Sequence, residues 1–135
     1  MTTYTYTATV TNVHDGDTIT VRLLLTPAGR LHQLDHDLGF NVHRTPRGIE
    51  LEGQAVRLLG CNAPELATPD GKTAQAALAA MLPIGSQVTI SSVAWDKYGG
   101  RVDAIVTDTT GRDITQAMIA AGHAKAWDGT GPKPV

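Results

Sequence analysis

The sequence predicts a small α+β fold, and three features of the chain support this prediction. Its 135 residues are enough for one domain with one core, which Val, Leu, Ile and Ala must fill because aromatic residues make up only 4%. Several segments alternate apolar and polar residues with the period of β-strands, and two others have the apolar spacing of helices. The order is three strands, a helix, two strands and a helix, which is typical of a five-stranded OB-type β-barrel with two to three helices.

The predicted elements are separated by turns that contain Gly or Pro. In chain order they are strands at residues 4–13, 17–25 and 54–60, a helix at 70–82, strands at 87–94 and 101–107, and a helix between residues 113 and 122. Thr68 or Asp70 caps the first helix, Asp113 caps the second, and Gly122 ends it. The capping residues therefore support both helices independently of the apolar spacing.

One domain covering residues 1–135 is expected, with one insertion and one tail. The insertion spans about residues 26–53, where Pro and Gly first break the pattern and residues 40–51 then form a strand or a hairpin that turns near Pro46. The tail at about 128–135 is rich in Gly and Pro, and we expect it to be flexible.

Composition restricts the compartment and the partners. The formal net charge of -2 argues against binding driven by bulk positive charge, so a nucleic acid would have to be held by a few placed arginines and a metal ion. Cys61 is the sole cysteine and excludes an intrachain disulfide, and we expect it and Trp127 to have packing roles. Residues 1–14 lack the apolar core of a secretory signal, and no apolar run is long enough to span a membrane. We therefore expect a cytoplasmic monomer without membrane association.

Three polar motifs are candidates for a functional site. Residues 15–18 (Asp-Gly-Asp-Thr) place two carboxylates on one face of an extended chain, where they could form one wall of a site for a hard cation. Residues 57–65 begin with an arginine that can clamp a phosphate and end with Asn62, an oxygen donor, and Glu65, a general base. Residues 96–101 carry a lysine, a tyrosine and an arginine that can contact a nucleotide. Taken singly, each motif is better explained as an ordinary turn or as solvated charges.

Taken together, in this order and at these spacings, the motifs resemble the staphylococcal-nuclease-like (thermonuclease) family. Residues 15–18 match its Asp-Gly-Asp-Thr motif, and residues 56–65 match its Arg-Leu-rich strand followed by an Asp-(Thr/Ala)-Pro-Glu loop. Residues 96–99 match its Asp-Lys-Tyr-Gly turn, and residues 111–124 resemble its second helix with the exit that follows. The resemblance implies an OB-fold enzyme that hydrolyses phosphodiester bonds in DNA or RNA with a bound Ca²⁺.

The resemblance also implies a role for each residue of the motifs. Asp17, the side chain of Asn62 and the backbone carbonyl of Ala63 would hold Ca²⁺, and Asp15 would orient these ligands without touching the ion. Arg57 and Arg101 would bind the scissile phosphate, and Glu65 would activate the attacking water. Lys97 and Tyr98 would contact a neighbouring phosphate or nucleoside.

Two positions depart from the family pattern. Asn62 stands where the family usually has Asp, and the lost charge should weaken Ca²⁺ binding. The family's second arginine directly follows Tyr-Gly, whereas here Gly100 takes that place and Arg101 follows. A slip of one residue on a regular strand would turn Arg101 to the opposite face, and we expect a bulge at Gly99-Gly100 to restore its direction. Arg112 is the alternative for this role.

These departures leave a second function open. An OB-fold can bind single strands without cutting them, and Asn62, Gly100 and the acidic net charge favour such a weakened or inactive binding module. The intact set of Asp17, Arg57 and Glu65 favours the enzyme, because a module that only binds does not need this combination. A third possibility, a structural component of a larger assembly, has no positive support in the sequence.

Overall fold

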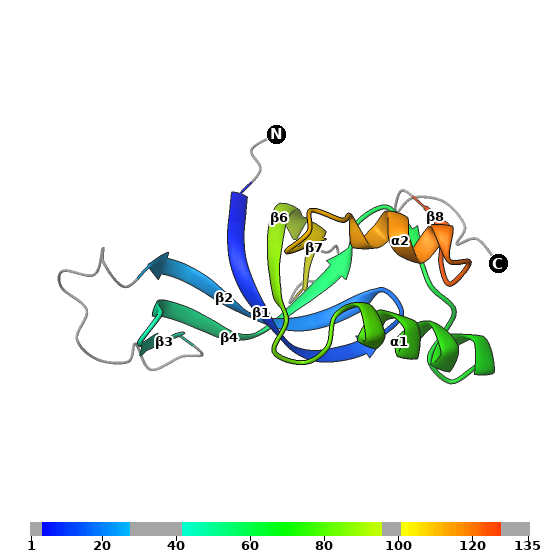
Figure 1. Cartoon of the computed structure of the whole chain (residues 1–135), viewed down its shortest axis with the longest axis horizontal. Helices are drawn as coiled ribbons and strands as arrows, with labels where there is room; N and C mark the ends of the chain where they lie inside the picture. The colour runs from blue at the N-terminus through cyan, green and yellow to red at the C-terminus, as the bar shows by residue number, and fades with distance from the viewer. Residues whose placement is uncertain (1–3, 28–41, 96–100, 128–135) are drawn as a thin grey trace.

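The computed structural model of the protein describes residues 4–27, 42–95 and 101–127. Its elements are β1 (Tyr4–Asp15), β2 (Thr18–Pro27), β3 (Val42–Thr45), β4 (Gly48–Leu58), β5 (Cys61–Asn62), α1 (Pro69–Met81), β6 (Gln87–Trp95), β7 (Arg101–Asp108), α2 (Ile114–Ala120) and β8 (Lys125–Ala126) (Figure 1). Within these ranges neither helix has the length and apolar character needed to cross a membrane.

Five of the strands close into a barrel. β1 pairs with β2 and with β6, β2 pairs with β4, and β6 pairs with β7, all antiparallel. A parallel pairing of β4 with β7 completes the ring in the order β1-β2-β4-β7-β6. With α1 between the third and fourth barrel strands and α2 after the fifth, the structure confirms the predicted α+β fold with an OB-type barrel.

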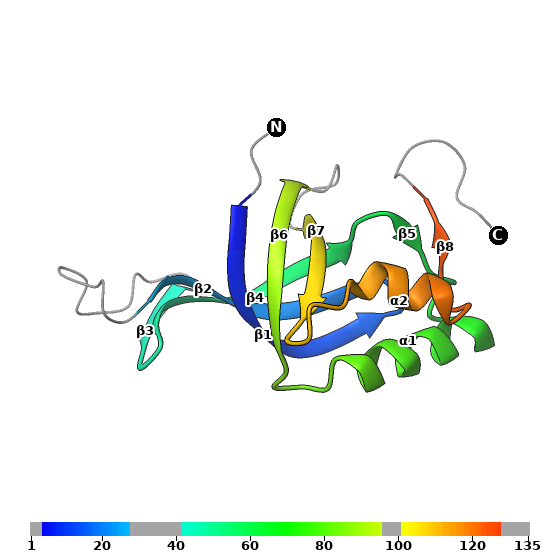
Figure 2. The ribbon, with the colours of Figure 1, turned by 45° about the horizontal axis from the view of Figure 1, so that its top comes forward.

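The core lies inside the barrel and under the two helices, as the alternating strand pattern predicts. Its largest fully buried apolar side chains come from all five barrel strands, from both helices and from the α1–β6 connection: Val10, Ile19, Val21, Val56, Leu58, Leu78, Leu82, Ile90, Val106, Ile114 and Met118. Both helices lie at the same end of the barrel in Figures 1 and 2, with β5 and β8 beside α2. This end carries the loops that position the candidate site.

The opposite end of the barrel carries the hairpin predicted within the insertion. β3 pairs with the first residues of β4 across a turn at Pro46 and Arg47, and the two strands extend away from the helices together with the end of β2 (Figure 1). Arg47 Nη1 donates a hydrogen bond to Thr9 Oγ1 at 3.0 Å, which ties the turn to β1. Most of the insertion segment predicted to be irregular, and the predicted tail, lie outside the described residues, so the proposed domain limits stay a prediction.

Both helix predictions are confirmed, to within a residue at the ends of α1. The side chain of Thr68 caps α1 by accepting a hydrogen bond from the Gly71 amide, which decides between the two predicted caps. Asp113 caps α2 in the same way through the Gln116 amide. Gly122 follows the last turn of α2 with a φ of 82°, the left-handed conformation expected of a residue that ends a helix.

The prediction for the third barrel strand was wrong at its start. β4 begins at Gly48 rather than at residue 54. Val21 and Leu23 of β2 pair with Gln54 and Leu51 of β4, so β4 has one extra residue between these two pairs, which is a β-bulge. Gly53 lies in this bulge with a φ of 71°. The bulge interrupts the apolar alternation but not the pairing, which is why the sequence pattern divides β4 between the predicted hairpin at 40–51 and the predicted strand at 54–60.

Candidate active site

Asp17 lies in the turn between β1 and β2, and the protein fixes both of its carboxylate oxygens. Oδ1 accepts a hydrogen bond from Thr18 Oγ1 at 3.1 Å, and Oδ2 accepts one from the backbone amide of Ala63 at 2.9 Å. The residue is only 8% exposed. The carboxylate is thus positioned before any ligand arrives, with the second contact joining the β1–β2 turn to the loop that follows β4.

Asp15, the last residue of β1, supports this turn from behind. Its Oδ1 accepts a hydrogen bond from the Asp17 amide at 3.1 Å. Burial, followed by the nearby charge of Asp17, raises the pKa of Asp15 above its ordinary value. This contact is compatible with the supporting role that the resemblance implied, and that role stays a prediction.

The glycine of the Asp-Gly-Asp motif has a packing reason that the sequence did not show. A Cβ atom on Gly16 would lie 2.7 Å from the Cβ atoms of both Ala63 and Ala74. An alanine side chain cannot rotate out of the way. The β1–β2 turn can therefore pack this closely against the site loop and α1 only because residue 16 has no side chain.

Arg57 contacts both the β1–β2 turn, through Asp17, and the loop after β4, through Asn62. It lies on β4 between the buried residues Val56 and Leu58, so its side chain leaves the barrel on the outer face. Its Nη2 lies 3.7 Å from Asp17 Oδ2 and 3.4 Å from Asn62 Oδ1. The side chains of Arg57 and Asp17 are each only 11% exposed, so the guanidinium brings the two oxygen donors together in a largely dry setting.

The loop after β4 is held by a small second sheet. Its first residues, β5, pair with β8 so that Cys61 faces Ala126 and Asn62 faces Lys125. Cys61 is fully buried, and burial together with the charge of Asp17 raises the pKa of its thiol to about 11. The thiol is therefore neutral at physiological pH, and the predicted packing role fits this environment.

Glu65 has an anchored backbone and an exposed side chain. Its carbonyl oxygen accepts hydrogen bonds from the amide of Thr68 at 3.0 Å and from the hydroxyl of Thr68 at 2.7 Å. A Cβ on Gly71 would lie 1.8 Å from the same oxygen, so α1 packs directly on this carbonyl. The first turn of α1 therefore fixes the position of the Glu65 backbone, while the Glu65 side chain remains exposed to solvent.

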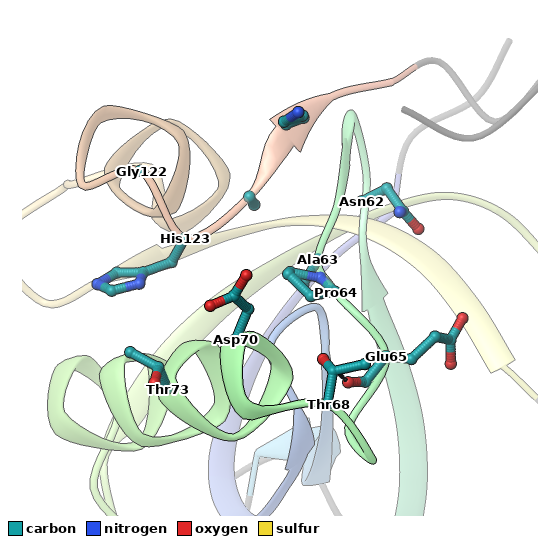
Figure 3. A pocket seen from close by; sticks show the side chains of 11 residues that line it. Asn62, Ala63, Pro64, Glu65, Thr68, Asp70, Thr73, Gly122 and His123 are labelled. Atoms are coloured by element: carbon teal, nitrogen blue, oxygen red, sulfur yellow. Dashed lines mark hydrogen bonds between the residues drawn. The ribbon is translucent and has the colours of Figure 1, made fainter. Parts of the chain in front are cut away.

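A hollow of about 600 Å³ adjoins this loop, between α1 and the residues after α2. Figure 3 shows Asn62 and Glu65 projecting to one side of the Ala63–Pro64 segment, whereas Thr73 and His123 lie on the other side. Asn62 and Glu65 are both among the residues that line the hollow, so it adjoins two residues of the candidate site.

Arg101, the first residue of β7, lies on the same face as Arg57. In the parallel β4–β7 pair, Ala55 faces Arg101 and Arg57 faces Asp103, while the alternate residue Val102 is buried. The strand register is therefore consistent with the predicted direction of the Arg101 side chain, whose role as a phosphate ligand stays a prediction. The expected bulge at Gly99-Gly100 and the predicted nucleotide contacts Lys97 and Tyr98 lie outside the described residues.

The alternative arginine is held elsewhere. Arg112 Nε lies 3.1 Å from Asp108 Oδ2, in the turn between β7 and α2. Asp108 is five residues along β7 from Asp103, roughly 16 Å at the rise of an extended strand. Arg112 is thus held by Asp108 at a distance from Arg57, and this placement favours Arg101 over Arg112 as the second phosphate ligand.

The donor set at Asp17 and Asn62 fits a hard cation held partly by water. Carboxylate, amide and backbone carbonyl oxygens of Asp17, Asn62 and Ala63 are the ligand types that Ca²⁺ prefers. No cluster of three or more His, Cys, Asp or Glu side chains suited to a metal occurs in the described part of the chain. The oxygen ligand types of Asp17, Asn62 and Ala63 suit a hard cation better than a transition metal.

Trp127 contacts the candidate site, and the sequence did not predict this contact. The guanidinium carbon of Arg57 lies 5.2 Å from the centroid of its ring. Its amide donates to the Gly60 carbonyl at 2.9 Å, which extends the β5–β8 pairing. No spacing in the sequence links position 127 to position 57; the paired strands bring the two together.

Comparison with known families agrees with this geometry. Residues 55–133, more than half of the chain, match the family described as staphylococcal nuclease homologue, and no curated protein matches the chain. The matched segment contains Arg57, Asn62, Glu65 and Arg101, and the fold brings Asp17, which precedes the segment, to the same place. The chain therefore belongs to the family of staphylococcal nuclease homologues.

Proposed function

We propose that this protein is a Ca²⁺-dependent nuclease that hydrolyses phosphodiester bonds in DNA, RNA or both. One observation carries the proposal: the Arg57 guanidinium lies between the Asp17 carboxylate and the Asn62 amide oxygen, on the face that Arg101 shares. At such a site the arginine can bind a phosphate group while a metal ion on the oxygen donors polarises it. Membership of the nuclease family supports the same conclusion.

Arg57 and Arg101 are the proposed phosphate ligands. A guanidinium offers several N–H donors in one plane and can bind two phosphate oxygens together. Because Arg57 is largely buried, its attraction to charge developing on those oxygens is screened less than on an open surface. Lys97 and Tyr98 would hold the neighbouring phosphate or nucleoside, as the family resemblance implies.

Asp17, Asn62 and the carbonyl of Ala63 are the proposed ligands of Ca²⁺. When bound, the ion would neutralise phosphate charge and place a water molecule for attack. The contacts from Thr18 and Ala63 orient the Asp17 carboxylate without using all of its lone pairs. The chain thus supplies a preformed carboxylate and leaves the remaining positions to water and substrate.

Glu65 is the proposed general base. The residue is exposed, and Figure 3 shows its side chain on the same side of the loop as that of Asn62. It would accept a proton from water as the water oxygen attacks phosphorus; the bond to the leaving oxygen breaks, and that oxygen departs with the bonding electrons and takes a proton from solvent. Since every proposed site residue belongs to one chain, we expect the monomer to be active.

A binding module without activity is the second candidate, and Asn62 is the observation that favours it. An amide in place of a carboxylate leaves Asp17 as the one charged ligand proposed for the metal. The net charge of -2 also predicts weak non-specific binding to nucleic acid. Such a module would bind single strands in a salt-dependent way whether or not a metal is present.

Cleavage of single-stranded DNA and RNA by the pure protein separates the two candidates. We expect cleavage with Ca²⁺ and none with chelator, and we expect Asp17→Ala, Arg57→Ala and Glu65→Ala each to reduce the rate strongly while the fold is kept. Mg²⁺ in place of Ca²⁺ tests the choice of ion. Near-wild-type rates in all three variants, or binding without cleavage under every metal, would refute the nuclease.

A further inference from the structure

We propose that Trp127 is a positioning residue for the reaction: its indole ring holds the Arg57 guanidinium in place while a metal occupies the oxygens beside it. This inference rests on the proposed nuclease function but concerns a residue that the motifs do not contain. The observation behind it is the 5.2 Å separation between the Arg57 guanidinium carbon and the centre of the Trp127 ring.

Trp127 is itself fixed by the β5–β8 sheet. Lys125 and Ala126 pair with Asn62 and Cys61, and the Trp127 amide continues the ladder with a 2.9 Å hydrogen bond to the Gly60 carbonyl. The same two strands therefore determine the position of Asn62 and the position of the ring. A change in one would be transmitted to the other through the backbone.

Two polar contacts of Arg57 are to atoms that the proposed metal would use. Its Nη2 is 3.7 Å from Asp17 Oδ2 and 3.4 Å from Asn62 Oδ1. A divalent cation on these oxygens would withdraw their lone pairs and repel the guanidinium. A neutral aromatic face is attracted to the guanidinium but does not compete with the cation for ligands.

Stacking also leaves the useful part of the guanidinium available. The N–H donors of arginine point outward in the plane of the group, so a ring that lies over the group need not take up any donor. A phosphate can then accept two hydrogen bonds from the edge while the ring limits motion of the group. The expected benefit is therefore in the transition state, where charge on the phosphate oxygens increases.

The first test is the catalytic effect of Trp127→Leu, which removes the ring, compared with Trp127→Phe, which keeps an aromatic face. With Ca²⁺ and single-stranded DNA, we expect kcat to fall about 2- to 30-fold in Trp127→Leu and less in Trp127→Phe, with little change in KM. Thermal unfolding of both variants identifies any general loss of fold.

A double-mutant cycle with Arg57→Gln shows whether Trp127 acts through Arg57. In the Arg57→Gln background no cation remains over the ring, so Trp127→Leu should change kcat less than about 2-fold. A merely structural role predicts the same loss in both backgrounds. Equal losses would overturn the proposal, as would an unchanged kcat in Trp127→Leu.

A spectroscopic test does not depend on cleavage. In a Trp95→Phe background, Trp127 is the only tryptophan, and its fluorescence should change when Arg57→Gln removes the cation over the ring. Addition of Ca²⁺ in place of chelator should not reproduce that change, because the guanidinium stays on the ring. If Ca²⁺ gives the same change as Arg57→Gln, or if Arg57→Gln gives none, the proposal is wrong even if the protein is a nuclease. If the fluorescence behaves as expected but no DNA is cut, the proposed function fails and the arginine–tryptophan contact stands.

Discussion

The two carboxylates of the candidate site, Asp17 and Glu65, are held in opposite ways. Asp17 is 8% exposed, and each of its carboxylate oxygens accepts a hydrogen bond from a fixed group. Glu65 is exposed, and the contacts with Thr68 hold its carbonyl and leave its carboxylate in solvent. A proposed metal ligand must be ready in advance, whereas a proposed base must reach a water molecule and release a proton.

This difference predicts two kinds of variant. Changes on the Asp17 side should affect stability and activity together, because the same groups hold the barrel end closed. Changes at the Glu65 side chain should affect activity alone, because surface substitutions seldom alter stability by much. The predictions below are arranged from the largest expected effect to the smallest.

Glu65→Gln should give the largest loss of rate without loss of stability. An amide cannot take a proton at neutral pH, so we expect kcat to fall roughly 100- to 10,000-fold. The free energy of unfolding should stay within about 0.5 kcal/mol of wild type. Asp17→Asn is the matched variant on the buried side, and it should lower both quantities. A stable and fully active Glu65→Gln would show that another group removes the proton.

Gly71→Ala should displace Glu65, the proposed general base, without changing its side chain. The new methyl group would overlap the Glu65 carbonyl, which must shift or push the first turn of α1 outward. A displacement of about 1 Å at a reacting group can cost roughly 100-fold in rate, and we expect a fall in kcat of this order in steady-state cleavage. Lys72→Ala, at the exposed neighbouring position, should keep the wild-type rate. Equal rates for both variants would mean that the α1 contact does not position Glu65.

Asn62→Asp should strengthen Ca²⁺ binding. A second charged ligand beside Asp17 should lower the Ca²⁺ concentration for half-maximal cleavage by about tenfold. At saturating Ca²⁺ the rate should change little, because the geometry of the loop is kept by the β5–β8 pairing. Unchanged or weaker Ca²⁺ dependence in Asn62→Asp would indicate that this side chain is not a ligand.

Asp108→Asn should give the smallest effect, in stability alone. A hydrogen bond from the Thr110 hydroxyl is the largest of several contacts that lower the pKa of Asp108 from 3.8 to about 2. The ionised form is therefore favoured by folding, so its contribution is complete above about pH 4 and is lost as the pH falls towards 2. Wild type should melt at a higher temperature than Asp108→Asn at pH 6, and the difference should shrink towards pH 2. A difference that grows with acid would contradict this sign.

Much of the fold follows from the sequence because it depends on local patterns. The strands around Val10, Ile19 and Ile90 alternate clearly, and the caps at Thr68 and Asp113 mark where the helices begin. The continuity of β4 did not follow, because its bulge at Gly53 breaks the alternation between the predicted hairpin at 40–51 and the predicted strand at 54–60. β5 and β8 did not follow either, since strands of two residues have no recognisable period.

The candidate site was predictable where residues are adjacent in a motif and not where only the fold joins them. Asp17, Arg57 and Asn62 were found through the motifs, and the structure brings them together. The contact of Trp127 with Arg57 depends on the pairing of two short strands, which leaves no trace in spacing. The packing of Gly71 on Glu65 depends on how α1 meets the loop.

The most direct test of the proposed function is the rate of single-stranded DNA cleavage by wild type and by Glu65→Gln, each measured with Ca²⁺ and with chelator. We expect cleavage by wild type with Ca²⁺ alone, and a rate at least roughly 100-fold lower for Glu65→Gln under the same conditions. Equal cleavage by the two proteins, or cleavage by wild type that persists in chelator, would contradict a Ca²⁺-dependent nuclease with Glu65 as its base.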